Sequence, residues 1–192
     1  MSAFRRLAGA LPLAALAACA GAPRPEPAPV PAPAAEGRLV LMGTTDLHGW
    51  ILPYDYSTGQ RTSNGLAALV PLIDSVRAAH PGRTVLVESG DLLQGNPLDF
   101  VYRRLAEGET HPLIHAMNLV EYDAAAIGNH EFNYGIEHLA RSTAAASFPF
   151  LSANVFRAGT DEHAYRPYTF VERTVGGRTV KIGITSATPP GV

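Results

Sequence analysis

The sequence predicts an α/β fold built on a largely parallel sheet, and two observations lead to this prediction. Three short apolar runs of strand length each end in a polar cluster: residues 39–42, 84–87 and 124–127. Segments with the hydrophobic period of a helix lie between these runs. Strands that alternate with helices are typical of a parallel sheet, and uninterrupted apolar runs predict strands that are buried on both faces.

The predicted helices follow one another along the chain. The first covers residues 66–80, where apolar side chains recur at helical spacing. Pro71 lies inside this segment and cannot donate a backbone hydrogen bond, so we expect the regular helix to begin at Pro71. Three more helices are predicted at residues 97–107, 112–120 and 135–146. The first two of these have Pro in the first turn, where the missing N–H loses no helical partner.

Two strand signals follow in the second half of the chain. A strand is expected to begin within residues 148–154. A hairpin is predicted from residues 168–175 and 178–186, because Gly176-Gly177 between them is typical of a two-residue turn. Residues 38–192 together have the size of one domain.

The first 37 residues indicate export rather than a folded structure. Residues 1–18 combine a charged start with a short apolar run rich in Leu and Ala, as a signal peptide does. Cys19 follows Leu16-Ala17-Ala18, which resembles a bacterial lipobox with an acylated cysteine; a plain signal peptide with an incidental cysteine is the alternative. Residues 19–37 would then form a lipidated Pro-rich tether. We expect an exported protein, anchored by lipid alone at the periplasmic or cell-surface face of a bacterial membrane.

Composition and charge exclude several classes of protein. Lys and Arg number 15 against 17 Asp and Glu, so the formal net charge of −2 gives no reason to expect a nucleic-acid polymer as a partner. One Cys excludes an intramolecular disulfide and a zinc site built on cysteines. No apolar stretch of about 18 residues is free of Arg or Pro, which argues against a spanning helix. The sequence leaves the oligomeric state open.

Polar clusters follow the three predicted strands at the same structural position, in residues 44–49, 90–91 and 128–131. Open α/β sheets bind ligands beyond the carboxyl ends of their strands, so we expect the clusters to converge on one crevice. Asp46 and His48 are two residues apart and would leave the same face of an extended segment, where both can bind one ion.

Each of these clusters also has an ordinary structural explanation when it is taken alone. Asp46 fits a turn and His48 a surface position, while Asp91 fits the N-cap of the next helix. Asn129 fits a turn after Gly128, and His130 fits a partly buried position. The order of the three motifs is more informative than any one of them.

D-x-H, then G-D, then G-N-H-E, each after an apolar strand, resembles the calcineurin-like metallophosphoesterase family. The resemblance implies a metallophosphoesterase-type β-sandwich flanked by helices and a site with two divalent metal ions. Asp46 and His48 would bind the first ion, Asp91 would bridge both, and Asn129 would bind the second. His130 would act on the leaving oxygen. Ligands of this mix accept Mn, Fe, Co, Zn or Mg, so the metals are not identified.

The longer motifs narrow the resemblance to the 5′-nucleotidase group, and within it to the branch of 2′,3′-cyclic-nucleotide 2′-phosphodiesterase/3′-nucleotidases. The 5′-nucleotidase branch usually has Asp three residues after the catalytic His, whereas this chain has Asn133. A neutral amide can orient an imidazole but cannot raise its pKa as a carboxylate would. Asn133 and Glu131 are expected to support the site without binding metal. The implied substrate is a small nucleotide, and a 5′-nucleotidase-type phosphatase is the alternative.

Part of the family pattern has no counterpart in this sequence. The family takes further metal ligands from a later isolated His and a G-H-x-H segment, and a separate C-terminal domain binds the base. His138 is expected on a helix surface and His163 in a loop. We therefore expect an N-terminal portion of the enzyme that is incomplete at its C-terminus and poorly active alone; a catalytically inactive truncated lipoprotein is the alternative. Trp50, Tyr54 and Tyr56 would either line the cleft or pack under the first motif.

Overall fold

The computed structural model describes residues 37–105 and 109–190 and contains a four-stranded sheet in the order β1-β4-β5-β6. Its strands are β1 (Val40–Thr44), β4 (Thr84–Glu88), β5 (Ala124–Ala126) and β6 (Phe150–Leu151). All three strand pairs are parallel, which confirms the predicted class. The three predicted strand runs become β1, β4 and β5, so their carboxyl ends lie at one edge of the sheet.

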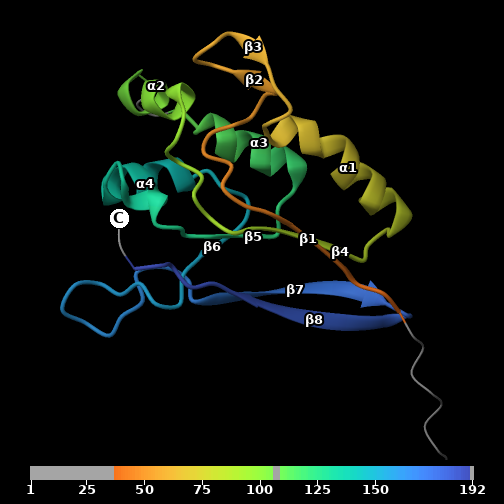
Figure 1. Cartoon of the computed structure of the whole chain (residues 1–192). Helices are drawn as coiled ribbons and strands as arrows, with labels where there is room; N and C mark the ends of the chain where they lie inside the picture. Colours follow the sequence, from red (N-terminus) through yellow and green to blue (C-terminus); the bar gives the residue numbers. More distant parts are fainter. Residues whose placement is uncertain (1–36, 106–108, 191–192) are drawn as a thin grey trace, which may run out of the picture. The chain divides into compact units, whose positions relative to one another are not determined.

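Four helices connect these strands and lie on one side of the sheet (Figure 1). They are α1 (Leu66–Ala79), α2 (Pro97–Leu105), α3 (Pro112–Val120) and α4 (Ile136–Thr143), and a short 3₁₀ helix, η1 (His130–Phe132), precedes α4. Leucine, isoleucine and methionine side chains from these helices bury the sheet face, among them Leu66, Ile73, Ile114, Met117 and Leu139. None of the helices in residues 37–105 and 109–190 has the length and hydrophobicity that crossing a membrane would require.

The start of α1 differs from the prediction, because the helix begins at Leu66 and contains Pro71. Two contacts hold the turn that precedes Pro71. The N–H of Leu66 donates to the Trp50 carbonyl at 2.9 Å, and the N–H of Ala67 donates to the Ile51 carbonyl at 2.8 Å. Leu66 is also buried in the core. Tertiary contacts therefore stabilise a helical turn that the local effect of proline disfavours.

The hairpin predicted around Gly176-Gly177 is confirmed as β7 (Tyr168–Val175) and β8 (Arg178–Thr185). Both glycines have positive φ, as the two-residue turn requires. The hairpin lies on the side of the sheet opposite the helices (Figure 1). The Arg173 side chain reaches the sheet, where Nε donates to the Thr84 carbonyl at 2.6 Å and the guanidinium pairs with Asp123. A second small hairpin, β2 (Tyr54–Asp55) and β3 (Gln60–Arg61), was not predicted.

The prediction of burial on both faces holds for β4 but is wrong for β1. Four of the five β4 side chains are buried, whereas burial alternates along β1 and Leu41 is 69% exposed. Because β1 is an edge strand of the sheet, it pairs only with β4, and the helices cover only the face that carries Met42. The apolar run indicated a strand correctly but did not indicate how many layers cover it.

Candidate metal centre

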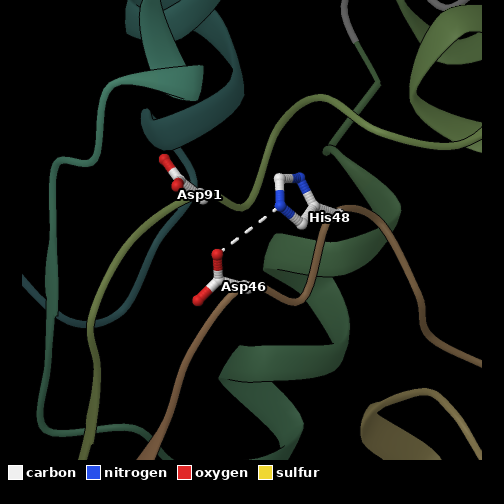
Figure 2. A group of neighbouring side chains, drawn as sticks. All are labelled: Asp46, His48 and Asp91. Atoms are coloured by element: carbon white, nitrogen blue, oxygen red, sulfur yellow. Dashed lines mark ion pairs between the residues drawn. The ribbon is translucent and has the colours of Figure 1, made fainter.

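Asp46, His48 and Asp91 come together at the carboxyl edge of the sheet (Figure 2). Asp46 and His48 lie in loop A (residues 45–49) after β1, and Asp91 lies in loop B (residues 89–96) after β4. Each offers one ligand atom, and these atoms are all within 4.8 Å of one another. Two carboxylate oxygens and one imidazole nitrogen suit a divalent cation, so the donor set fits the metal that the motifs imply.

The backbone of these loops is not the extended segment that the sequence led us to expect. Asp46, His48 and Asp91 have φ of 54°, 45° and 64°, in the left-handed region that non-glycine residues rarely adopt. Hydrogen bonds between the loops hold this conformation: the N–H of Asp46 donates to the Gly90 carbonyl and that of His48 to the Asp91 carbonyl, at 3.2 and 3.0 Å. Strained backbone of this kind concentrates at functional sites. His48 Nε2 still lies 3.7 Å from Asp46 Oδ1.

Loop B fixes the orientation of the His48 ring. Nδ1 of His48 is in hydrogen-bond contact with the Gln94 carbonyl, which can only accept, so Nδ1 carries the proton. Nε2 is then the atom with a free lone pair, and it faces Asp46. This contact needs glycine at position 95, where a Cβ would lie 2.6 Å from the His48 Cβ. A second ring hydrogen bond that fixes the tautomer is usual for a metal-binding histidine.

Asn96 also holds loop A, a role that no pattern in the sequence predicted. Its Nδ2 donates to the His48 carbonyl at 2.6 Å. Its Oδ1 accepts from the N–H of Leu98 at 2.7 Å, inside the first turn of α2. One buried amide therefore connects loop A to the N-terminus of α2.

Glu131 is fully buried and holds the backbone of Asp91 by hydrogen bonding. One of its oxygens, Oε2, accepts from the N–H of Asp91 at 2.9 Å and from that of Gly128 at 2.6 Å. The other, Oε1, accepts from the N–H groups of Leu92 and Leu93. Burial raises the pKa of Glu131, while the hydrogen bonds from the backbone oppose the rise. The carboxyl group joins the ends of β4 and β5 at the site.

His130 reaches the site through both its backbone and its ring. The N–H of His130 donates to Asp91 Oδ1 at 2.9 Å, and the ring lies edge-on to that of His48 with centroids 5.1 Å apart. Nδ1 of His130 is 2.7 Å from Asn133 Oδ1. The amide oxygen of Asn133 can only accept, so Nδ1 of His130 donates and its Nε2 has a free lone pair. Asn129, the N-cap of η1, immediately precedes His130 and is partly exposed.

Glu88 is a titratable group near the site that the sequence analysis did not single out. It is 2% exposed at the end of β4, and burial raises its pKa to about 7. Thr44 Oγ1 donates to Glu88 Oε2 and lies 2.8 Å from the Tyr122 hydroxyl, whose pKa burial raises to about 12. The folded chain therefore retains on Glu88 a proton that the unfolded chain releases below neutral pH. The sequence signal that could have identified Glu88 is its position as an acidic residue at the end of the apolar run 84–87.

His138 is not on the helix surface where it was expected. It is 3% exposed on the inner face of α4, with Nε2 3.3 Å from Ser142 Oγ and the ring edge-on to that of Tyr134. Burial lowers its pKa to about 4, so it is neutral in the folded chain at physiological pH. His163, by contrast, is an exposed loop residue as predicted, and it stacks on Phe156.

The aromatic residues after loop A divide between the two roles considered for them. Trp50 lines a cavity of about 330 Å³ together with Asp46, His48 and Asn64, so it does border the site. Tyr56 instead packs against Trp50, with ring centroids 6.0 Å apart, and Tyr54 packs against Tyr56 at the same distance.

Comparison with known proteins identifies relatives of this chain. No family model matches the chain. Curated relatives include the trifunctional nucleotide phosphoesterase protein YfkN of Bacillus subtilis, which is 38% identical over 166 residues. Another is the 2′,3′-cyclic-nucleotide 2′-phosphodiesterase/3′-nucleotidase of Yersinia enterocolitica, which is 39% identical over 162 residues. Each alignment covers 80% of this chain, but the chain spans only 11% and 25% of the two relatives.

A solved structure shows the same relation in three dimensions. The crystal structure of the calcineurin-like phosphoesterase YfkN from Bacillus subtilis matches with a TM-score of 0.76 and 38% identity. The match covers 81% of this chain and 49% of that chain. The resemblance predicted from the three motifs is thereby confirmed: the chain is a homologue of part of the calcineurin-like phosphoesterases that include bacterial 2′,3′-cyclic-nucleotide 2′-phosphodiesterase/3′-nucleotidases.

Proposed function

We propose that the chain carries one part of the metal centre of a nucleotide phosphoesterase that hydrolyses 2′,3′-cyclic nucleotides and 3′-nucleotides. The observation that carries this proposal is the convergence of Asp46, His48 and Asp91 from two loops, with His130 beside them. The relatives named for nucleotide hydrolysis support the substrate class.

The proposed ligands divide between two divalent cations. Asp46 and His48 would hold the first through a carboxylate oxygen and Nε2, Asp91 would contribute to both, and Asn129 would hold the second through its amide oxygen. Such a pair of cations would supply Lewis acidity to the phosphoryl oxygens and hold them for in-line displacement. The contribution of the loops is to keep these donors in place before metal binds, through the hydrogen bonds of His48 with loop B and of Asp91 with Glu131.

His130 is proposed to act on the leaving oxygen rather than on a cation. When Nδ1 donates to Asn133, Nε2 is free to exchange a proton with that oxygen. Asn133 orients the ring through a neutral amide, at the position where the 5′-nucleotidase branch usually has an Asp. This neutral partner is the reason to favour the cyclic-nucleotide and 3′-nucleotide substrates over 5′-nucleotides.

The substrate assignment is tested by matched substrates. We expect residues 38–192, exchanged into the Yersinia enterocolitica relative in place of the aligned segment, to hydrolyse 2′,3′-cyclic AMP and 3′-AMP faster than 5′-AMP.

We also expect the 192-residue chain alone to be poorly active, because two cations need more ligands than its motifs provide. The measurement is phosphate or nucleoside release with Mn²⁺, after EDTA, and without metal. Preference for 5′-AMP would contradict the assignment, and full activity of the chain alone would contradict the missing-ligand argument.

We further propose that Cys19 carries lipid and tethers the domain to a membrane through residues 20–37. Cys19 lies outside the residues that the structure describes, so this proposal depends on the sequence alone. Cys19→Ala should leave the protein exported but release it from the membrane fraction, because a multiply acylated cysteine supplies the hydrophobic contact with the bilayer. The measurement is the distribution of both forms between membrane and soluble fractions. Equal membrane retention would reject the lipid anchor.

A further inference from the structure

Two ionisable side chains that the proposed mechanism does not use lie behind loop A and are completely buried. Asp99 is in the first turn of α2 and His111 is the N-cap of α3, and both are 0% exposed. His111 Nε2 lies 3.5 Å from Asp99 Oδ1. Neither Asp99 oxygen nor His111 Nε2 has a hydrogen-bond partner among the residues that the structure describes. A buried pair of this kind is costly to form, so its position needs an explanation.

The hydrogen bonds of His111 determine which of its nitrogens carries the proton. Nδ1 of His111 accepts from the N–H of Leu113 at 3.2 Å, as the N-cap of α3. Nδ1 therefore uses its lone pair for this bond and carries no proton, so the proton of the neutral ring lies on Nε2. The Nε2–H faces Asp99 Oδ1 across 3.5 Å, and the Asp99 carboxyl group is fully buried.

The Asp99 carboxyl group occupies the space beside Gly49, the last residue of loop A. A Cβ at Gly49 would lie 2.2 Å from Asp99 Oδ2, 2.3 Å from Oδ1 and 2.4 Å from Cγ. Gly49 has φ of 72° and follows His48 directly. A second contact lies just before α2, where Asn96 Nδ2 donates to the His48 carbonyl. Asn96 and the first turn of α2 thus contact two consecutive residues of loop A, His48 and Gly49.

We propose that Asp99 and His111 are positioning residues for the metal centre. His111 fixes the Asp99 carboxyl group, and this group fixes the turn at Gly49, which in turn sets the place of the His48 ring. The pair acts through His48 and does not itself touch metal or substrate. This inference rests on the proposed function, because it gives Asp99 and His111 a role only if His48 binds metal.

The test compares variants of the 192-residue chain by two measurements. Mn²⁺ affinity is measured by titration, and the tautomer of His48 is measured without metal by ¹⁵N NMR of the histidine rings, with His48→Asn to assign the signal.

Asp99→Ala removes the carboxyl group and should weaken Mn²⁺ binding by about 10–100-fold, the usual effect of losing a group that orients a ligand. Asp99→Asn keeps the shape and an acceptor for His111 Nε2–H, and it should restore most of the affinity. His111→Asn keeps a cap for α3 but removes the donor, so it should weaken Mn²⁺ binding as Asp99→Ala does.

Gly49→Ala tests the contact from the other side. The new Cβ would meet the Asp99 carboxyl group, so this variant should lose Mn²⁺ affinity to a similar degree. Gly82→Ala is the matched control, because Gly82 also has positive φ (68°) but has no atom within 4 Å of the added Cβ. It should therefore bind Mn²⁺ as the parent chain does. Because Asp99→Ala removes the clash, adding Gly49→Ala to it should cause little further loss.

The outcomes separate this inference from the proposed function. Circular dichroism and the urea midpoint identify the variants that remain folded. If Asp99→Ala does not fold, the Mn²⁺ affinity and the His48 signal of Gly49→Ala and His111→Asn test the positioning role. Weakened Mn²⁺ binding with an altered His48 signal in the folded variants supports the positioning role. Parent-like affinity and an unchanged His48 signal in those variants would overturn it while the metal centre stands. If the parent chain does not bind Mn²⁺ but the His48 signal still responds to Asp99→Ala and Gly49→Ala, the metal assignment fails and the positioning of His48 stands.

Discussion

Replacing Asp91 with Asn should empty the metal centre, whereas replacing His130 with Asn should leave metal content unchanged and reduce turnover. Asp91 Oδ1 already accepts from the His130 N–H. An Asn amide that keeps this contact with its oxygen must turn its NH₂ group, a donor, toward the cation. The loss should exceed the roughly 10–100-fold that follows removal of a group that only supports a ligand.

His130→Asn acts differently because the contact with Asp91 comes from the backbone N–H of His130, which the substitution retains. Only the ring is lost, and with it the group proposed to act on the leaving oxygen. In the chimera with the Yersinia enterocolitica relative, we expect near-parental metal content and a rate about 10²–10⁴-fold lower, the usual contribution of general acid–base help. Metal content is measured by elemental analysis and rate by hydrolysis of 2′,3′-cyclic AMP.

Two matched substitutions at exposed helix positions serve as controls. Asp74→Asn on α1 and His115→Asn on α3 change the same side chains away from the site and should alter neither quantity. If His130→Asn emptied the centre, His130 would be a ligand and the assignment of roles would be wrong. If Asp91→Asn retained its metal, the bridging role of Asp91 would be wrong.

The sequence predicted the elements whose signals are local. Pro112 marks the first turn of α3, and Gly176-Gly177 sets the turn between β7 and β8, so both were located to within a residue. The position of the site was also predictable, because three polar clusters followed three parallel strands and parallel strands end at one edge. These signals need no knowledge of distant contacts.

Features that depend on distant contacts were not predictable from the same patterns. Loop A takes left-handed backbone because it bonds to loop B, more than 40 positions away. His138 follows the charged Glu137 but is buried, since the face of α4 that meets α2 and α3 was not evident from eight residues. The same holds for Asp99 and His111, whose pairing joins two separate helices. Packing determines which polar side chains are buried, and their spacing in the sequence does not predict this burial.

Glu131→Gln should destabilise the fold strongly although the side chains have nearly the same shape. The carboxylate accepts from four N–H groups, two on each oxygen, at Asp91, Gly128, Leu92 and Leu93, and the last three of these contacts are buried. Glutamine has one acceptor oxygen, so its NH₂ group must face one of the two donor pairs. Each buried donor without a partner costs about 1–3 kcal/mol, so we expect the free energy of unfolding to fall by about 3 kcal/mol or more.

The urea midpoint of the metal-free chain measures this loss, and Glu137→Gln is the matched control. Glu137 is exposed in the first turn of α4 and should change stability by no more than about 0.5 kcal/mol. Equal midpoints for the two variants would mean that the four hydrogen bonds do not hold the loops. A large loss at Glu131 alone would show that this carboxyl group stabilises the fold. In that case Glu131→Gln should also weaken Mn²⁺ binding at temperatures where the variant remains folded, because the N–H of Asp91 would no longer have the acceptor that fixes its loop.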